Sequence, residues 1–160
     1  MDVNDYLIDQ TDKDWNALLE DWVEVLPSTF TIWFVNRIGD LILAFEDGSI
    51  HLLDVGHGTI EKIAESREQF CELIDAGDNA EDWLMISLVD ECRAAGITIS
   101  ANQCYGFKIP PLLSGKYEVS NIAPIDLAEH YSFLADIFQQ TKNFPNGTKL
   151  KLVIKNKPAG

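Results

Sequence analysis

The side chains that could do chemistry in this chain are few and widely spaced. Its three histidines, His51, His57 and His130, do not form the HxxxH spacing that places two imidazoles on one helical face for zinc. His51 stands in a predicted strand, where a cross-strand or surface role is usual, and His130 stands on the last predicted helix beside Glu129. The histidines therefore predict neither a zinc site nor an activated nucleophile.

The glycine and serine patterns lack the frame of known catalytic loops. Gly56-His57-Gly58 matches neither the GxGxxG of dinucleotide binding nor the GxxxxGK[ST] of a phosphate loop, and Asp54 before it would repel phosphate. No serine lies in a GxSxG elbow. A loop that needs positive φ explains the glycines better. We therefore predict a protein that is not an enzyme, with no catalytic residues and no cofactor.

Neither the cysteines nor the densest acidic run predicts a metal site. Cys71, Cys92 and Cys104 are odd in number and form no CxxC pair; we expect Cys71 and Cys92 to be small buried thiols in a chain without a disulfide framework. That use of cysteine favours a reducing compartment. Asp78–Asp82 lacks the alternating ligands and closing Glu of a calcium loop, and acidic residues are common where a helix begins.

Acidity is the strongest compositional feature of the chain. The net charge is −14, and residues 1–100 carry 22 acidic and 5 basic side chains, against 4 and 7 in residues 101–160. An acidic surface repels phosphate backbones and anionic lipid, so binding to nucleic acid or membrane is disfavoured. The charge fits two alternatives: solubility alone, or steered association with a basic protein partner.

Length and composition indicate one folded domain. The 160 residues, 46% of them apolar, suffice for a single core, and we expect one domain over residues 1–160. No apolar run approaches the ~18–20 residues of a membrane span. The beginning of the chain is acidic and does not resemble a signal peptide. These features predict a cytoplasmic location.

The first half of the chain predicts a helix followed by antiparallel strands. Residues 12–25 have helical spacing of apolar residues, with Thr11 as the N-cap and Val23 on the inner face. Three apolar runs then predict a β-meander, and a two-residue Asp-Gly turn at positions 47–48 is expected between the last two. The runs are Thr31–Asn36, Leu41–Glu46 and Ser49–Asp54.

The second half is predicted to be mostly helical. Ile60–Ala64 is a short strand or turn, and Ser66–Gln69 matches a capping box that opens a helix. Further helices are expected from about 80 to 95, ending at Gly96, and over Asp126–Thr141, with a terminal edge strand at Lys149–Ile154. The fold class is therefore α+β, an antiparallel β-meander with helices packed on one side.

The segment Gln103–Tyr117, QCYGFKIPPLLSGKY, is specific in sequence but offers no carboxylate and no histidine. We predict a rigid positioning segment that Pro110-Pro111 holds extended. Its apolar side chains, Ile109, Leu112 and Leu113, are expected to pack against helices.

Several blocks of the sequence resemble a widespread bacterial family of unknown function. They are FTIWFVNRIGDLILAFEDGSIHLLDVGHGTIEKIAESREQFCELID, NAEDWLM, NQCYGFKIPPLLSGKY and IDLAEHYSFLADIFQQTKNFPNGTKL, and they span about residues 27–152. That family also forms the C-terminal domain of immunity proteins paired with type VI secretion DNase toxins. The resemblance implies a non-catalytic α+β domain that binds a protein. The fused immunity proteins carry a further N-terminal domain, where this chain has a short acidic helix over about residues 12–25.

Three functional hypotheses follow. The first is a cytoplasmic protein-binding domain, as in an immunity protein that neutralises a basic toxin. The second is a small-ligand-binding protein or enzyme with a pocket near Tyr105, Lys108 and Tyr117, and the third is a housekeeping interaction scaffold. For the first hypothesis, the densest acidic group outside the N-terminal helix is the predicted partner surface: Asp75, Asp78, Glu81 and Asp82.

Overall fold

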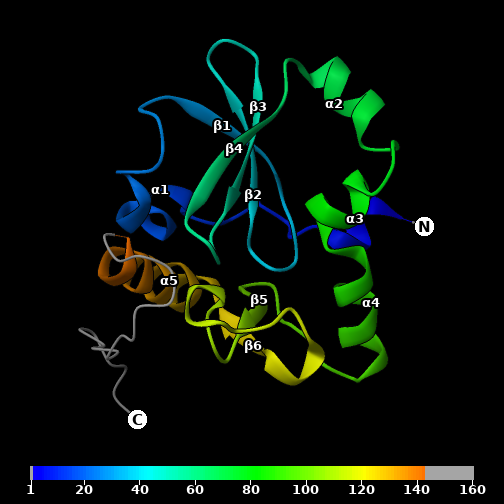
Figure 1. The fold of residues 1–160 in the computed structure, drawn as a ribbon, viewed down its shortest axis with the longest axis vertical. Helices are drawn as coiled ribbons and strands as arrows, with labels where there is room; N and C mark the ends of the chain where they lie inside the picture. Colours follow the sequence, from blue (N-terminus) through cyan, green and yellow to red (C-terminus); the bar gives the residue numbers. More distant parts are fainter. Residues whose placement is uncertain (1, 143–160) are drawn as a thin grey trace.

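The computed structural model describes residues 2–142, in which a four-stranded sheet and a two-stranded ribbon are combined with helices (Figure 1). The strands are β1 (Phe30–Val35), β2 (Leu41–Phe45), β3 (Ile50–Asp54), β4 (Thr59–Ala64), β5 (Gln103–Phe107) and β6 (Ile122–Asp126). The α-helices are α1 (Trp15–Leu18), α2 (Arg67–Leu73), α3 (Asn79–Leu84), α4 (Ile86–Ala94) and α5 (Leu127–Thr141). Four 3₁₀ turns complete the described elements: η1 (Val3–Tyr6), η2 (Glu20–Trp22), η3 (Pro111–Leu113) and η4 (Val119–Asn121).

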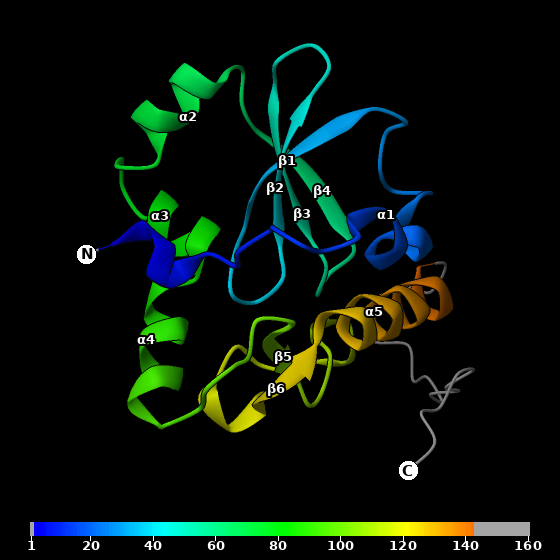
Figure 2. The same cartoon turned by 180° about the vertical axis from the view of Figure 1, so that it is seen from behind.

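The predicted antiparallel meander is confirmed, and it gains a fourth strand. The strand order is β1-β2-β3-β4, each strand antiparallel to the next. Leu41, Ile42 and Leu43 of β2 are each at most 1% exposed, so this strand is covered on both faces. Figures 1 and 2 show α2, α3 and α4 on one flank of the sheet and α1 and α5 on the other. The predicted α+β class is thus confirmed, but the helices lie on both flanks of the meander instead of on one side.

The connection between β2 and β3 is longer than predicted, and the connection between β3 and β4 is a further hairpin turn. The loop between β2 and β3 has three residues, 46–48, because Phe45 N donates to Ser49 O and Gly48 takes a φ of +87°. That geometry is the three-residue hairpin with a left-handed glycine, not a two-residue turn. The segment around Gly56-His57-Gly58 is a tight hairpin turn, since Asp54 pairs with Thr59 across it.

The single N-terminal helix predicted over residues 12–25 is wrong. Asp12 has a φ of +59°, and Asp14, not Thr11, caps the four-residue α1 by accepting from Ala17 N. The chain then forms η2, where Trp22 Nε1 donates to Tyr131 O of α5 at 3.0 Å. Because of this tertiary hydrogen bond, the segment does not continue as a regular helix. Val23 is 69% exposed instead of facing inward.

The long helix predicted from about 80 to 95 is divided into α3 and α4. Met85 has a left-handed φ of +53°, and the Trp83 carbonyl accepts from Asn36 Nδ2 at 3.1 Å. Glu81 then caps α4, because its carboxylate accepts from Ser87 N. The division lets a core asparagine satisfy the end of α3.

The capping signals on either side of this pair are confirmed. Ser66 is the N-cap of α2 and its hydroxyl accepts from Gln69 N at 3.1 Å, while Gln69 Oε1 accepts from Glu65 N. Gly96 follows α4 with a φ of +80°. Both are the local geometries that these residue types favour.

A two-stranded ribbon, β5–β6, was not predicted, and it occupies part of the expected positioning segment. Pro111–Leu113 forms the 3₁₀ turn η3, so the expectation of extended chain across Pro110-Pro111 is wrong for the second proline. Ile109 is 54% exposed and does not pack against a helix. Leu112 is only half-buried. Pro111 starts η3 because its fixed φ suits the first position of a helical turn.

The loop that follows β5 is nevertheless held rigidly, as a positioning segment requires. The amide of the buried Asn121 donates to the carbonyls of Ile109 and Lys116, and its oxygen accepts from Ile109 N, all within 2.9 Å. Gly115 lies so close to Ile109 O that no Cβ fits there. One asparagine thus closes the loop by side-chain hydrogen bonds.

The last helix is confirmed over nearly its full predicted range. α5 begins after Asp126 and buries Leu127, Tyr131 and Leu134. Tyr131 Oη donates to Gly39 O at 2.7 Å, which ties the helix to the β1–β2 turn. The strand predicted at Lys149–Ile154 lies outside the described residues.

Candidate functional site: an acidic groove and an acidic cluster

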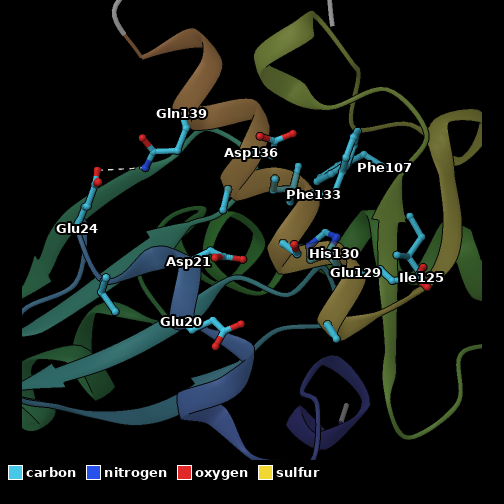
Figure 3. A pocket seen from close by; sticks show the side chains of 15 residues that line it. Glu20, Asp21, Glu24, Phe107, Ile125, Glu129, His130, Phe133, Asp136 and Gln139 are labelled. Atoms are coloured by element: carbon cyan, nitrogen blue, oxygen red, sulfur yellow. Dashed lines mark hydrogen bonds between the residues drawn. The ribbon is translucent and has the colours of Figure 1, made fainter. Parts of the chain in front are cut away.

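A groove of about 880 Å³ lies between η2, α5 and the β5–β6 ribbon (Figure 3). Glu20, Asp21 and Glu24 border it from the η2 segment, and Phe107 and Ile125 border it from the ribbon. α5 supplies the remaining lining residues: Ala128, Glu129, His130, Ser132, Phe133, Leu134, Ala135, Asp136 and Gln139; Val23 completes the η2 side. We call this site the α5 groove. It is large enough for a peptide segment or a small ligand.

The charge of the α5 groove is of one sign. Five carboxylates line it and no Lys or Arg does. Glu24 accepts from Gln139 and pairs with Lys142 at 3.1 Å, and these contacts lower its pKa, the Gln139 hydrogen bond most. Glu20, Asp21 and Glu129 are exposed and make no hydrogen bond or ion pair within the described residues. Three acids are therefore available to an incoming cation; Figure 3 labels them as Glu20, Asp21 and Glu129.

The base of the α5 groove is part of the protein core. His130 is 2% exposed, and burial lowers its pKa to about 4, so the imidazole is neutral. Its Nε2 has no hydrogen-bond partner and lies against Gly39, where a Cβ would come within 2.9 Å of the ring. Gly39 has a φ of +96°. The histidine thus packs into the β1–β2 turn.

The predicted partner surface is a different feature, on the loop from α2 to α3 and on α3 itself. Asp75, Asp78 and Asp82 are exposed and Glu81 is partly buried. We call these four residues the α3 cluster. Asp78 stands at the N-cap of α3 without a side-chain bond, and Glu81 caps α4. All four lie within residues 75–82, and none of them lines either of the two grooves described here.

The WFVNRIGD block, prominent in the sequence, has a structural role. Asn36 Oδ1 accepts from Ile38 N and Asp40 N, and Asp40 accepts from Val55 N at 3.1 Å. Asp40 is 3% exposed; burial, reinforced by the nearby Asp54, raises its pKa to about 8. These bonds fix the turn against which His130 and Tyr131 pack.

A second polar group has catalytic residue types but not catalytic geometry. His57 Nδ1 lies 2.8 Å from Asp54 and 3.3 Å from the Tyr117 hydroxyl, so one ring nitrogen serves both neighbours. Burial raises the pKa of Tyr117, which is the opposite of what a nucleophile or a base needs. The Tyr117 ring stacks near His57 with a centroid distance of 5.8 Å. The arrangement positions the loop before β4.

The segment hypothesised to line a pocket, Tyr105–Tyr117, contributes Phe107 to the α5 groove. Tyr105 is buried and donates its hydroxyl proton to Ile97 O, whereas Lys108 is exposed. None of Tyr105, Lys108 and Tyr117 lines either of the grooves described here; the second groove, of about 490 Å³, lies between the N-terminal segment and Arg37. A ligand-binding role for these three side chains therefore stays a prediction.

The cysteines differ from one another in accessibility. Cys92 is buried as predicted and Cys104 is also buried, but the expectation for Cys71 is wrong, since it is exposed on α2. Burial raises the pKa of both buried thiols. Among residues 2–142, no three His, Cys, Asp or Glu side chains are grouped to hold a metal ion. None of the helices in that range has the length and apolar character that crossing a bilayer would take.

Part of the sequence matches a known protein family. The fold and the two acidic surfaces fit a binding domain of the α+β class. Residues 64–138 match the family model described as type VI secretion system immunity protein Tdi1, C-terminal. The resemblance drawn from the sequence is thus confirmed over α2 to α5, which include the α3 cluster and the α5 side of the groove. No curated protein matches the chain.

Sequence reasoning found the α3 cluster but missed the α5 groove. The cluster is contiguous in sequence, whereas the groove joins side chains more than a hundred positions apart, from Glu20 to Gln139. One usable signal was present: Glu129 and Asp136 lie on the outer face of a well-predicted helix. Nothing in the local pattern reveals that η2 lies beside them.

Proposed function

We propose that this chain is a non-catalytic, cytoplasmic protein-binding domain of the immunity type, which neutralises a basic toxin by occupying its surface. The observation that carries the proposal is the match of residues 64–138 to a type VI secretion immunity family. The net charge of −14 supports a basic partner, because opposite charges accelerate encounter and discriminate against wrong partners. One domain over residues 1–160 would perform this function.

In this proposal the α3 cluster steers the partner. Three of its four carboxylates are exposed, and each rim pair that they form is worth ~1 kcal/mol or less. Their combined effect falls on the association rate, which salt then reduces. Steering requires no pocket, and an exposed acidic surface suits it.

The function is tested by searching the neighbouring genes for a toxin, co-expressing that toxin with the chain, and measuring both cell growth and complex formation. We expect growth to be restored and a stable complex to be purified. A chain that neither binds this toxin nor protects the cells would instead be a scaffold or a ligand-binding protein.

The site is tested by changing Asp75, Asp78, Glu81 and Asp82 together to Lys and measuring association by stopped flow at several salt concentrations. We expect association about tenfold slower at low salt, with a flatter salt dependence and an unchanged fold. A matched control keeps Glu81, the cap of α4, and reverses only the three aspartates. An unchanged rate and salt slope in both variants would place the steering surface elsewhere.

A further inference from the structure

We propose that the α5 groove binds a segment of the toxin in which an aromatic or aliphatic side chain is flanked by Lys or Arg. The proposal rests on the proposed function for the source of the segment. Its chemistry, however, follows from the groove alone. The α5 groove supplies an anchoring site, whereas the sequence suggested only a steering surface, the α3 cluster.

The first argument is charge complementarity. Glu20 and Asp21 border one side of the groove and Glu129 the other, all three exposed and without a partner in the described part of the chain. A cation that binds there forms its ion pairs without breaking existing ones. Lys142, which lies near the groove, is paired with Glu24. The groove therefore favours positively charged groups at its rim.

The second argument is the apolar surface between those acids. Val23 is 69% exposed, and Phe107, Phe133 and Ile125 line the opposite part of the groove (Figure 3). Covering an exposed valine with an apolar group is favourable by about 25 cal/mol per Å² of buried apolar surface. Metal ions and simple polyamines do not use such a surface, so the occupant has an apolar side chain as well as cations.

The third argument is rigidity, which lowers the entropic cost of binding. The two walls are joined by the bond from Trp22 Nε1 to Tyr131 O, and Trp22 stacks on Phe138 with a centroid distance of 6.0 Å. Tyr131 is in turn bonded to Gly39 O. A preformed groove of one charge suits a partner of opposite charge. A second copy of this chain is disfavoured, because it also carries a net charge of −14.

The experiment uses the full chain and a fluorescein-labelled, amidated peptide with four Lys around a central Phe, with binding followed by anisotropy. The groove variant is Glu20→Gln, Asp21→Asn and Glu129→Gln. The matched control is Asp75→Asn, Asp78→Asn and Asp82→Asn, which changes the net charge equally. We expect the groove variant to weaken binding about tenfold and the control about twofold or less. Circular dichroism verifies that both variants are folded.

The apolar part is tested with the same peptide in which Ala replaces Phe, and with Val23→Ala. We expect weaker binding in both cases, by about fivefold or more for the peptide change. Equal loss in the groove variant and the matched control would overturn the site. Unchanged binding of the Ala peptide, or equal competition by spermine, would overturn the anchor.

The same two triple variants are then measured with the toxin. If the peptide binds in the groove but no toxin is neutralised, the proposed function fails and the groove chemistry stands. If the toxin binds both variants equally well, the groove is not its anchoring site and the inference fails while the function stands.

Discussion

The α5 groove and the α3 cluster are both acidic, but they are supported in different ways. The groove rests on the centre of the molecule, where His130 packs against Gly39 and Tyr131 bonds to the same turn. The cluster stands on short helices, α2 of seven residues and α3 of six, joined by a loop that contains Gly77. Helices of this length depend on tertiary contacts for their stability.

The difference indicates that the α3 cluster and the α5 groove have separate roles in binding. The exposed charges of the α3 cluster serve long-range attraction, which depends little on their exact positions. A concave surface with apolar walls serves close contact, which depends on the positions of its walls. Changes to buried residues that support the groove, such as His130, should therefore also disturb folding, whereas changes at the cluster should remain local.

The sharpest test of this comparison is Gly39→Ala against Gly77→Ala. Both glycines have positive φ, but a Cβ on Gly39 comes within 2.9 Å of the His130 ring, whereas nothing lies within 4 Å of one on Gly77. We expect Gly39→Ala to lower the free energy of unfolding by about 3 kcal/mol or more, and Gly77→Ala by about 1 kcal/mol. Urea denaturation measures both. Equal losses would mean that the turn tolerates movement of His130.

The second test concerns pH, and it uses the titratable groups beneath the groove. The pKa of Asp40 is raised to about 8, so its neutral form stabilises the fold at low pH and this stability is lost as pH rises toward 8. The pKa of His130 is lowered to about 4, so its contribution is lost in the opposite direction, as pH falls from 6.5 to 4.

Of these two groups, Asp40 is the one whose ionisation changes the free energy of unfolding between pH 6.5 and 8. We expect the free energy of unfolding to fall by about 2 kcal/mol across this window in the wild type, and Asp40→Asn to remove most of that fall. The amide oxygen can still accept from Val55 N. Chemical denaturation at several pH values measures the slope, and an equally steep fall in the variant would assign it to another group.

Leu112→Ala tests the loop that joins the ribbon to the groove side of the molecule. Truncating a fully buried leucine to alanine lowers the free energy of unfolding by ~2–4 kcal/mol. Leu112 is half-buried, so we expect a loss of about 1–2 kcal/mol. Thermal unfolding measures the change. A loss of 4 kcal/mol would show that η3 packs more tightly than its exposure indicates.

The smallest effect is expected at the support of the α3 cluster. Ser66→Ala removes the N-cap of α2 and should cost about 1 kcal/mol. Hydrogen exchange should show faster exchange in α2 with little change in α5. Ser120→Ala is the control, because Ser120 is exposed and makes no hydrogen bond within the described residues. Exchange that accelerates equally in α5 would contradict the local support of the cluster.

Much of the fold was predictable where the sequence pattern is local. The meander has an Asp-Gly turn between apolar runs, and α5 has an uninterrupted helical spacing of apolar residues, so both were predicted within a residue or two. The N-cap of α2 was visible as Ser66 with Gln69 three positions later. In each case the short-range signal agrees with the tertiary contacts.

The remaining elements depend on contacts between distant residues. β5 contains Gly106, a poor strand former, and it is a strand because Ile125 covers the glycine from β6. The N-terminal helix is interrupted by the bond from Trp22 to α5, and the helix after residue 79 is interrupted at Met85. The α5 groove inherits this difficulty, since one of its walls is the interrupted segment.

The exposed cysteine on α2 has a practical consequence. With Cys92 and Cys104 buried and their thiol pKa values raised, Cys71 is the one native thiol that a maleimide reagent can reach quickly. A single dye can therefore be attached to the wild-type chain without mutagenesis, four positions before Asp75. Such a label would report the arrival of a partner at the α3 cluster independently of contact at the α5 groove, and so give the order of the two events in time.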